Sequence, residues 1–399
     1  MKICYVVYRE DNVMVFDSQV LLFLKEMKTR NEIDGIELIV FRHNPNLTKK
    51  KAVEDKIHMF VDECKTFASF PVLSKAQLDF NAFRLKHYVR GKYEVNEQIA
   101  VICRGELATY MGAKAFASYP NSRVLFDNRG LPLEESEMRY GDRKIHVINR
   151  KNKRKALDFA KSHCDMYNFV TNEMRKYLLE KYSYKNELPY TIIPTLYHPE
   201  DVDWEGWERV VQLERYTPDQ MVVSYIGSTA SWQSTSQLIS IIEKIGTAYK
   251  KARFIILTNG EIEEIKSLPS DVKDRLTVKG VPHSQMKYYL KMSDFGIVIR
   301  DENIVNQVAA PTKIAEYLTA GVSMLYAGNI GILRDIKDKV DASMLISVDQ
   351  DSNWIVKIDN LYSQKKKVNS AVLDYFDMKK RQSDTIQMIQ KSFDNEKVK

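Results

Sequence analysis

A positively charged helix start occurs in the segment 297–321, IVIRDENIVNQVAAPTKIAEYLTAG. Pro311 lies where the first turn of a helical pattern begins, a position that proline favours. Proline has no N–H, so the predicted donors are the backbone groups of Thr312, Lys313 and Ile314, which lack intrahelical partners. The Lys313 side chain adds a full charge beside the positive end of the helix dipole. This helix start is therefore a candidate anion site.

An acidic side chain, Glu316, follows one turn later between the apolar residues Ala315 and Tyr317. A carboxylate on an apolar helix is costly to bury unless it accepts hydrogen bonds, and the hydroxyl groups of a ribose could donate them. Alternatively, Glu316 and Lys313 form an ion pair at i, i+3 spacing on a solvated face. Both interpretations stay open from spacing alone.

A second candidate anion site is the segment 222–233, VVSYIGSTASWQ. An apolar run ends at Gly227, and the small hydroxyl residues Ser228 and Thr229 follow before a helical pattern. A strand, a glycine loop and a helix start present backbone N–H groups to a diphosphate. The alternative is an ordinary βα turn in which a serine caps the helix.

Charged side chains follow two neighbouring strands that we expect in the first half of the chain. Arg104 comes directly after one strand, and Asp127 and Arg129 come after the next. Sites in open α/β sheets lie outside the carboxyl ends of strands, so both loops should face one crevice. The arginines could bind an acceptor together with Glu135, or pair with Asp127 and Glu135 in a structural network. Asp127 would position an arginine or act as a base toward an acceptor hydroxyl.

Several common catalytic motifs are absent from the sequence. The seven histidines show no metal-ligand spacing, and neither HExxH nor a DxD triplet occurs. The chain also lacks a GxSxG elbow, a GxxxxGK[ST] P-loop and a GxGxxG after the first apolar run. These absences argue against a metal centre and against hydrolase, P-loop kinase and dehydrogenase functions.

The elements that must position these side chains alternate between short β-rich apolar runs and longer amphipathic segments. This alternation is typical of βαβ units that build a parallel sheet, so the predicted fold class is α/β. In the first half we expect strands at Ile3–Val7, Ile36–Phe41, Ile99–Cys103, Arg123–Phe126, Tyr167–Val170 and Tyr190–Ile193. Helical patterns in this half cover Ser18–Thr29, Leu107–Ala117 and Lys155–His163.

The alternation stops between Pro194 and Asp219 and then resumes. Strands are expected in the second half at Met221–Ile226, Phe254–Leu257, Leu276–Val278, Phe295–Ile299 and Ser323–Tyr326. We therefore predict two Rossmann-like domains, at 1–200 and 221–370, with a linker at 201–220. The polar, Lys-rich segment 371–399 should form a surface helix pair.

Size and charge set limits on the class of protein. With 399 residues and 44% hydrophobic content, the chain can bury two ordinary cores. A formal charge of +7 favours anionic partners such as phosphates, nucleotides or the inner membrane leaflet. The alternative is that this modest excess of lysine only keeps the surface soluble.

Cysteine usage and hydropathy predict a cytoplasmic protein. Cys4, Cys64, Cys103 and Cys164 lie far apart without a CxxC pair, which favours a reducing compartment. The apolar run near Met1 is too short for a signal peptide, and no stretch approaches the roughly 20 apolar residues of a membrane span. We expect any association with an anionic membrane to be peripheral.

These motifs together resemble retaining glycosyltransferases of the GT-B fold, in the large fourth sequence family that includes capsule and exopolysaccharide enzymes. The resemblance covers both halves and is strongest at RDENIVNQVAAPTKIAEYLTAG, with its Arg–acid–Asn loop, Asn306 and the Pro–Thr–Lys start. YIGSTASWQ resembles the glycine loop of the family, and FDNRG resembles an element of its N-terminal domain.

The resemblance implies that two domains face each other across a cleft and that the C-terminal domain binds a nucleotide-sugar donor. Gly227 and Ser228 would face the diphosphate, with Lys313 opposite them. Glu316 matches the second glutamate of the E-x7-E motif and would contact the nucleotide ribose. The first glutamate is replaced by Val308. The C-terminal helix would cross back to the first domain.

A donor site of this kind needs positive charge where the leaving nucleoside diphosphate develops negative charge. Arg300 and Lys313 are the predicted residues for this role, so neither a metal nor another cofactor is expected. The resemblance implies transfer with retention to a glycan or lipid-linked acceptor, without a named nucleophile.

Two other functions compete with this one. A nucleotide-sugar 2-epimerase would share the fold and donor pocket, but no histidine follows the Arg104 or Gly227 loops. A non-catalytic protein that binds nucleic acid or a membrane surface would show a concentrated basic stripe. The Lys-rich stretches at 48–51, 150–155 and 364–367 are short, so no nucleic-acid partner is expected.

Overall fold

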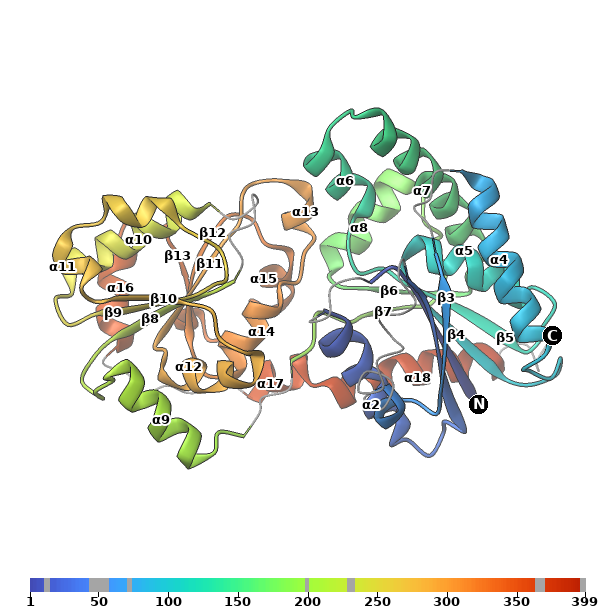
Figure 1. Ribbon diagram of the computed structural model, residues 1–399, viewed down its shortest axis with the longest axis horizontal. Coiled ribbons are helices and arrows are strands. Elements are labelled where there is room, and N and C mark those ends of the chain that lie inside the picture. Colours follow the sequence, from blue (N-terminus) through green and yellow to red (C-terminus); the bar gives the residue numbers. More distant parts are fainter. Residues whose placement is uncertain are drawn as a thin grey trace. The chain divides into compact units, whose positions relative to one another are not determined.

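The computed structural model describes residues 1–10, 15–42, 57–69, 74–197, 201–227, 234–362 and 370–394. The chain forms two compact units. Unit 1 comprises Met1–Pro194 and the segment from Met378, and unit 2 comprises Thr195–Asp377. Each unit has a sheet with helices on both faces (Figure 1). The two units are described separately below.

The described part of unit 1 contains a parallel sheet of seven strands in the order β3-β2-β1-β4-β5-β6-β7. Its strands are β1 Lys2–Tyr8, β2 Gly35–Arg42, β3 Glu63–Ala68, β4 Ile99–Arg104, β5 Ser122–Asp127, β6 Met166–Phe169 and β7 Tyr190–Ile192. Its helices are η1 Phe16–Leu21, α2 Leu22–Lys28, α4 Lys75–Arg90, α5 Gly105–Phe116, α6 Pro132–Tyr140, α7 Lys144–His163, α8 Asn172–Tyr182 and α18 Met378–Asp394.

Unit 2 has a parallel sheet of six described strands in the order β10-β9-β8-β11-β12-β13. The strands are β8 Val222–Ile226, β9 Arg253–Leu257, β10 Leu276–Lys279, β11 Phe295–Ile299, β12 Ser323–Ala327 and β13 Leu345–Ser347. The helices are α9 Trp204–Glu214, α10 Thr235–Ala248, η3 Glu263–Ser267, α11 Ser270–Lys273, η4 His283–Gln285, α12 Met286–Met292, α13 Ile304–Gln307, α14 Thr312–Thr319, α15 Gly331–Ile336, η5 Ala342–Met344, α16 Trp354–Tyr362 and α17 Ser370–Phe376.

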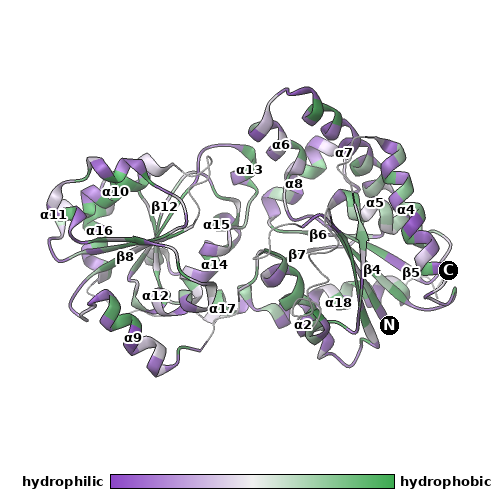
Figure 2. Ribbon diagram, viewed as in Figure 1, coloured by the Kyte–Doolittle hydropathy of each residue, from purple (hydrophilic) through white to green (hydrophobic). Residues whose placement is uncertain are grey.

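Both sheets reverse their strand order at one point. In unit 1 the reversal lies between β1 and β4, and in unit 2 between β8 and β11. Loops at the carboxyl ends of these neighbouring strands diverge to opposite faces of the sheet, and ligands bind in the crevice that this leaves. Because the central strands β1, β4, β8 and β11 are buried on both faces, they are largely apolar (Figure 2).

The predicted α/β class and the two parallel sheets are confirmed. The structure adds two edge strands that the sequence analysis missed, β3 and β13. Most of β3 is only half-buried, and β13 has three residues, so neither has a continuous apolar run. Helix α7 is also longer than expected and begins at Lys144. Its first half is mostly exposed or half-buried and mixes lysine and arginine with isoleucine, so it lacks a continuous apolar face that would mark a helix in the sequence.

The segment that was expected to be a linker contains helix α9. Asp203 caps this helix by accepting a hydrogen bond from Gly206 N–H at 2.7 Å. At its end, buried Glu214 accepts a hydrogen bond from the Tyr289 hydroxyl at 3.0 Å and pairs with Arg253 at 3.8 Å. These contacts attach the segment to unit 2, and the boundary between the units falls between Pro194 and Thr195.

The predicted surface helix pair at the C-terminus is divided between the two units. Helix α17 buries Val372, Tyr375 and Phe376 in the core of unit 2. Helix α18 belongs to unit 1, where buried Gln382 donates a hydrogen bond to the Phe23 carbonyl at 2.5 Å. The last helix therefore crosses back to the first unit. No helix in the described ranges is both long enough and apolar enough to cross a bilayer.

Replacing Gly296 with alanine should destabilise unit 2. A Cβ atom at Gly296 would lie 2.5 Å from ring carbons of Tyr317, which is fully buried. Overpacking of this kind costs about 1–3 kcal/mol of the free energy of unfolding. Urea unfolding monitored by circular dichroism would measure it. Gly91→Ala is the control, because its Cβ atom would have 3.7 Å of space. Equal midpoints for the two variants would contradict the packing argument.

Candidate functional site

The start of helix α14 is buried. Lys313 is 8% exposed and Glu316 is 7% exposed, and their neighbours Ile314, Ala315 and Tyr317 are fully buried. The prediction of a solvated face for Lys313 and Glu316 is therefore wrong, although Glu316 still attracts Lys313. A buried lysine and a buried glutamate need compensating interactions, so this helix carries its charges at a cost in stability.

Burial lowers the pKa of Lys313 to about 7, because the ammonium loses its hydration. Repulsion from Arg300 lowers this pKa further, whereas attraction to Glu316 raises it. The Lys313 Nζ atom lies 4.7 Å from the centre of the Tyr225 ring on β8. Lys313 therefore titrates near neutrality, and an anion bound beside it would favour the charged form.

Arg300 follows β11 at the carboxyl edge of the unit 2 sheet. Its Nε atom is buried and has no hydrogen-bond partner among the described residues. Burial lowers the pKa of its guanidinium. Gly328 has a φ of 86° and follows β12, the strand beside β11. A Cβ atom at Gly328 would lie 1.9 Å from the Arg300 carbonyl oxygen, so only glycine allows the backbone to pass this closely. The need for glycine at position 328 was not visible in the sequence, because it depends on this contact between two strands.

Two backbone donors that were predicted for an anion are already used within the fold. The Ile314 N–H donates to the Pro311 carbonyl at 3.1 Å, and the Gly227 N–H donates to the Leu257 carbonyl at 3.1 Å. Pro311 is the N-cap residue of α14, and the helix begins at Thr312. An anion at this edge would therefore depend on Thr312 and the cationic side chains. Ser228 and Thr229 lie outside the described residues.

Asn306 supports the loop between Arg300 and α14. It is buried, and its side-chain amide donates a hydrogen bond to the Asp301 carbonyl at 3.0 Å. Its backbone N–H donates to the Asn303 side chain at 2.9 Å. The geometry thus gives Asn306 a positioning role in this loop beside its predicted role in donor binding.

Tyr317 joins the two candidate segments of unit 2 and was missed as a functional residue. Its hydroxyl accepts a hydrogen bond from the Ile226 N–H at 3.0 Å and donates one to the Ser224 carbonyl at 3.3 Å. Tyr317 follows Glu316, and Ile226 precedes Gly227. This side chain therefore fixes the glycine loop of β8 relative to the charged helix.

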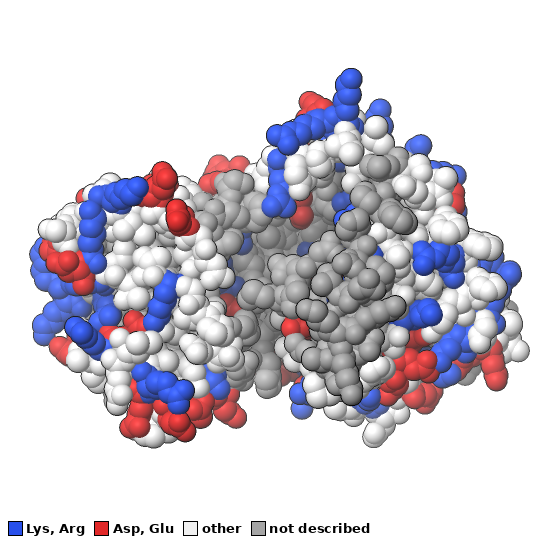
Figure 3. Space-filling model, viewed as in Figure 1, with Lys and Arg blue, Asp and Glu red and all other residues white. Residues whose placement is uncertain are grey.

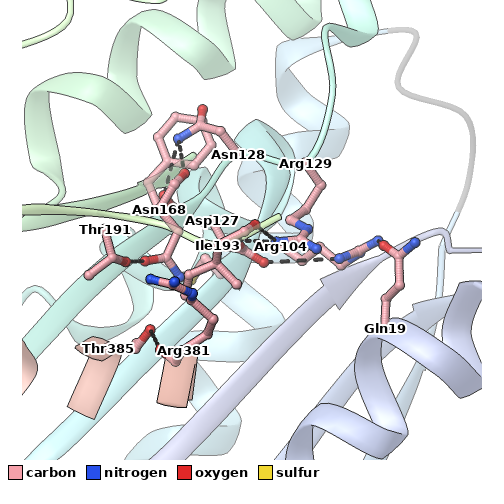
Figure 4. A network of polar contacts seen from close by, with 12 residues as sticks. Gln19, Arg104, Asp127, Asn128, Arg129, Asn168, Thr191, Ile193, Arg381 and Thr385 are labelled. Carbon is pink, nitrogen blue, oxygen red and sulfur yellow. Dashed lines mark hydrogen bonds and ion pairs between the residues drawn. The ribbon is translucent and has the colours of Figure 1, made fainter. Parts of the chain in front are cut away.

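In unit 1, Arg104, Asp127 and Arg129 form a buried charge network (Figure 4). Arg104 NH1 lies 4.0 Å from one carboxylate oxygen of Asp127, and Arg129 NH1 lies 3.7 Å from the other. Arg104 also donates to Gln19 at 2.9 Å, and Arg129 donates to the Ile193 carbonyl at 2.9 Å. The structure thus shows the predicted network, in which Asp127 positions both arginines.

A cavity of about 280 Å³ lies at the carboxyl ends of β1, β4 and β5 in unit 1. Arg104, Arg129 and Glu135 line it, so the three predicted acceptor-binding residues lie together. Within the described ranges Glu135 forms no ion pair with either arginine, and it accepts a hydrogen bond from the Leu131 N–H at 3.1 Å. The other polar lining residues are Tyr8, Glu10, Glu106, Asn128, Glu134, Lys153, Tyr182 and Tyr184.

Glu106 is the cavity residue that sequence reasoning missed most clearly. It lies at the start of α5, directly after Gly105, whose φ is 84°. Burial raises the pKa of Glu106, and the nearby Lys153 lowers it. The Arg–Gly–Glu order was visible in the sequence, but Lys153 is on α7, and only the tertiary structure brings it to the same cavity.

No group of three or more His, Cys, Asp or Glu side chains suited to a metal ion occurs in the described ranges of the chain.

Comparison with known proteins places this fold. Neither a protein-family model nor a curated protein sequence matches the chain. Among solved structures, a glycosyltransferase from Rickettsia africae ESF-5 matches with a TM-score of 0.66 and 14% identity, covering 99% of both chains. Anabaena Alr3699/HepE in complex with UDP matches with a TM-score of 0.63 and 12% identity, covering 100% of both. The lipopolysaccharide outer core galactosyltransferase WaaB matches with a TM-score of 0.66 and 10% identity, covering 98% of this chain and 99% of that one.

The chain has the GT-B fold. The similarity extends over both units. It therefore covers the full length of the chain and is not limited to one Rossmann-like half. At identities of 10–14%, the similarity concerns the fold, and the residues of each site must support the function by their own geometry.

Replacing Asp127 with asparagine should destabilise unit 1. The change removes the carboxylate that lies within 4.0 Å of both Arg104 and Arg129, and it leaves Arg104 with Glu10, at 3.4 Å, as its remaining ion-pair partner. Breaking a buried pair in this way costs about 3 kcal/mol or more. Urea denaturation would measure the loss. Asp142→Asn is the control, since Asp142 is exposed and pairs with Arg150 at 3.3 Å. An unchanged midpoint for Asp127→Asn would show that the network carries no such constraint.

Proposed function

We propose that this protein is a glycosyltransferase that moves a sugar from a nucleotide-sugar donor to an acceptor. The observation that carries the proposal is the group of buried Lys313, buried Glu316 and half-buried Arg300 at the carboxyl edge of the unit 2 sheet. This edge is where GT-B chains, with their Rossmann-like topology, would bind a nucleotide. The similar Alr3699/HepE has been solved with UDP and with UDP-glucose, which supports a nucleotide sugar as donor.

The electrostatics of unit 2 suit a nucleoside diphosphate. Arg300 and Lys313 repel each other in the free protein, and a bound diphosphate would place negative charge beside both of them. Glu316 lies one turn further along α14, where its carboxylate would accept hydrogen bonds from ribose hydroxyls. The site therefore accounts for the phosphates and the ribose with groups of opposite charge.

The same cations would assist the reaction. As the bond between the sugar and the diphosphate breaks, negative charge builds on the leaving phosphate. Arg300 and protonated Lys313 would stabilise that charge without a metal ion, so chelation should not abolish turnover. The acceptor, a glycan or a lipid-linked saccharide, would bind in the unit 1 cavity beside Arg104, Arg129 and Glu135.

The finer parts of the proposal rest on the sequence resemblance. They are transfer with retention and a role in polysaccharide or glycoconjugate assembly such as that of capsule. The proposed cytoplasmic location rests instead on cysteine usage and hydropathy. Chemical analysis of the product would test retention, because the anomeric configuration of the new bond is compared directly with that of the donor. Conversion of the donor to its 2-epimer without an acceptor would favour the epimerase instead.

Loss of charge at Lys313 should weaken donor binding more than stability. Lys313→Met keeps the apolar stem and removes a charge-assisted hydrogen bond to the diphosphate. Such a bond contributes on the order of 1.5–3 kcal/mol, so UDP affinity and turnover should fall tenfold or more.

Glu316→Gln should weaken nucleotide binding with little change in melting temperature. Titration with UDP and a donor-turnover assay would measure both effects. Lys250→Met, at an exposed position, is the matched control. Wild-type affinity and turnover in both site variants would remove the support for this donor site.

Nucleotide binding should take up a proton above neutral pH. In the free protein Lys313 has a pKa of about 7, so at pH 8.5 most molecules carry it uncharged. A bound diphosphate raises this pKa, so binding at pH 8.5 should absorb up to about one proton, whereas binding at pH 6 should absorb none. Calorimetry in buffers of different ionisation enthalpy measures this uptake directly.

Lys313→Arg provides the control for this measurement. An arginine stays charged across this pH range, so the variant should bind without proton uptake at pH 8.5. Equal uptake by the wild type and the arginine variant would place the titrating group elsewhere.

A further inference from the structure

The first half of helix α7 exposes apolar and basic side chains together. Ile145 is 56% exposed and Ile148 is 47% exposed, and Met138, at the end of α6, is 46% exposed. Lys144, Lys151 and Lys155 are exposed beside them. None of these three lysines forms an ion pair with a residue in the described part of the chain.

Helical spacing places Ile148 and the three lysines on one face, and Ile145 lies to the side of this face. Lys144, Ile148, Lys151 and Lys155 follow at i, i+4, i+7 and i+11, which is a single stripe of an α-helix. The opposite face of the helix buries Asn152, Ala156, Leu157 and Ala160, and α7 packs against α5. In an ordinary amphipathic helix the exposed face is polar, whereas the exposed part of α7 combines lysine with Ile145 and Ile148.

The charge of the whole chain is concentrated here. Between Met138 and Lys155 the sequence contains eight Lys or Arg residues and one acidic residue, Asp142, which gives a net charge of +7. The formal charge of the entire protein is also +7, so the remainder of the chain is neutral on balance. Figure 3 shows lysine and arginine side chains beside uncharged ones where α6 and α7 lie. The basic excess is thus a local feature and not a general property of the surface.

Contacts within unit 1 hold this region in place. Arg150 donates a hydrogen bond to the Gly141 carbonyl at 2.7 Å, which ties α7 to the turn that precedes it. The Tyr140 and His146 rings stack with centroids 3.9 Å apart. A partner would therefore meet a preformed surface and need not order it first.

We propose that the α7 surface, formed by Met138, Lys144, Ile145, Ile148, Lys151 and Lys155, docks unit 1 on a bilayer of anionic phospholipids. The lysines would lie among the headgroup phosphates, and the aliphatic side chains would enter the boundary with the acyl chains. Nucleic acid would satisfy the charges but would leave Met138, Ile145 and Ile148 in water. The combination of charge and aliphatic surface thus favours the bilayer, independently of the proposed transfer reaction.

Sedimentation with vesicles tests this surface on the full-length protein. Vesicles of phosphatidylcholine and phosphatidylglycerol at 3:1 should bind the protein, and vesicles of phosphatidylcholine alone should not. Lys144→Ala, Lys151→Ala and Lys155→Ala combined should reduce the partition coefficient about 100-fold, since each cation near an anionic surface contributes about fivefold. The matched control is the triple alanine variant of the exposed Lys244, Lys250 and Lys251 in unit 2, which should bind as the wild type does.

The aliphatic side chains are tested separately from the charges. Ile145→Ser with Ile148→Ser should reduce binding about tenfold or more and leave the salt dependence unchanged, because the double change removes apolar area only. Leu213→Ser with Val356→Ser, at exposed positions in unit 2, is the control. Equal binding to neutral vesicles, equal losses in the control variants, or wild-type binding by both α7 variants would overturn the proposal. So would binding to RNA or DNA that exceeds binding to the anionic vesicles.

Discussion

The burial of like charges beside one another is the constraint on which the candidate donor site depends. Lys313 and Arg300 are both withdrawn from water, and their repulsion contributes to the lowered pKa of Lys313. An arrangement of this kind costs stability in the free protein, and an anionic ligand removes part of that cost. The diphosphate of the proposed donor would place negative charge beside both cations.

The surrounding fold maintains this arrangement through close contacts. Gly328 lets β12 approach the Arg300 backbone, and Gly296 gives the Tyr317 ring room on β11. The Tyr317 hydroxyl then holds the end of β8. Gly296, the Tyr317 ring and the Tyr317 hydrogen bond together set the distance between the end of β8 and helix α14. A small change in this packing would therefore displace Lys313 and Glu316, which are buried at a cost in stability.

The two units differ in the charges that surround the arginine at the carboxyl edge of each sheet. Each sheet places arginine at the carboxyl end of a strand beside its reversal point, Arg104 on β4 and Arg300 after β11. In unit 1 the carboxylate of Asp127 lies between Arg104 and Arg129, so the network is largely compensated within the protein. In unit 2 the Arg300 Nε atom has no partner among the described residues. The carboxylate between its arginines suits the unit 1 network to positioning, and the repulsion between Arg300 and Lys313 suits the unit 2 edge to an anion.

The sequence by itself determined the α/β class, the two parallel sheets and the position of charged residues after strands. These features depend on apolar patterns and strand ends, which are local properties of consecutive residues. It did not determine β3 or β13, whose residues lack a continuous apolar run. It also left open whether Lys313 and Glu316 were solvated, since helical spacing does not reveal which face a neighbouring strand covers. Tertiary structure decided that both are buried, that Lys153 joins Glu106 in one cavity, and that α18 returns to unit 1. These features depend on contacts between residues far apart in the chain, and burial, which sets the pKa of Lys313, exists only once those contacts have formed.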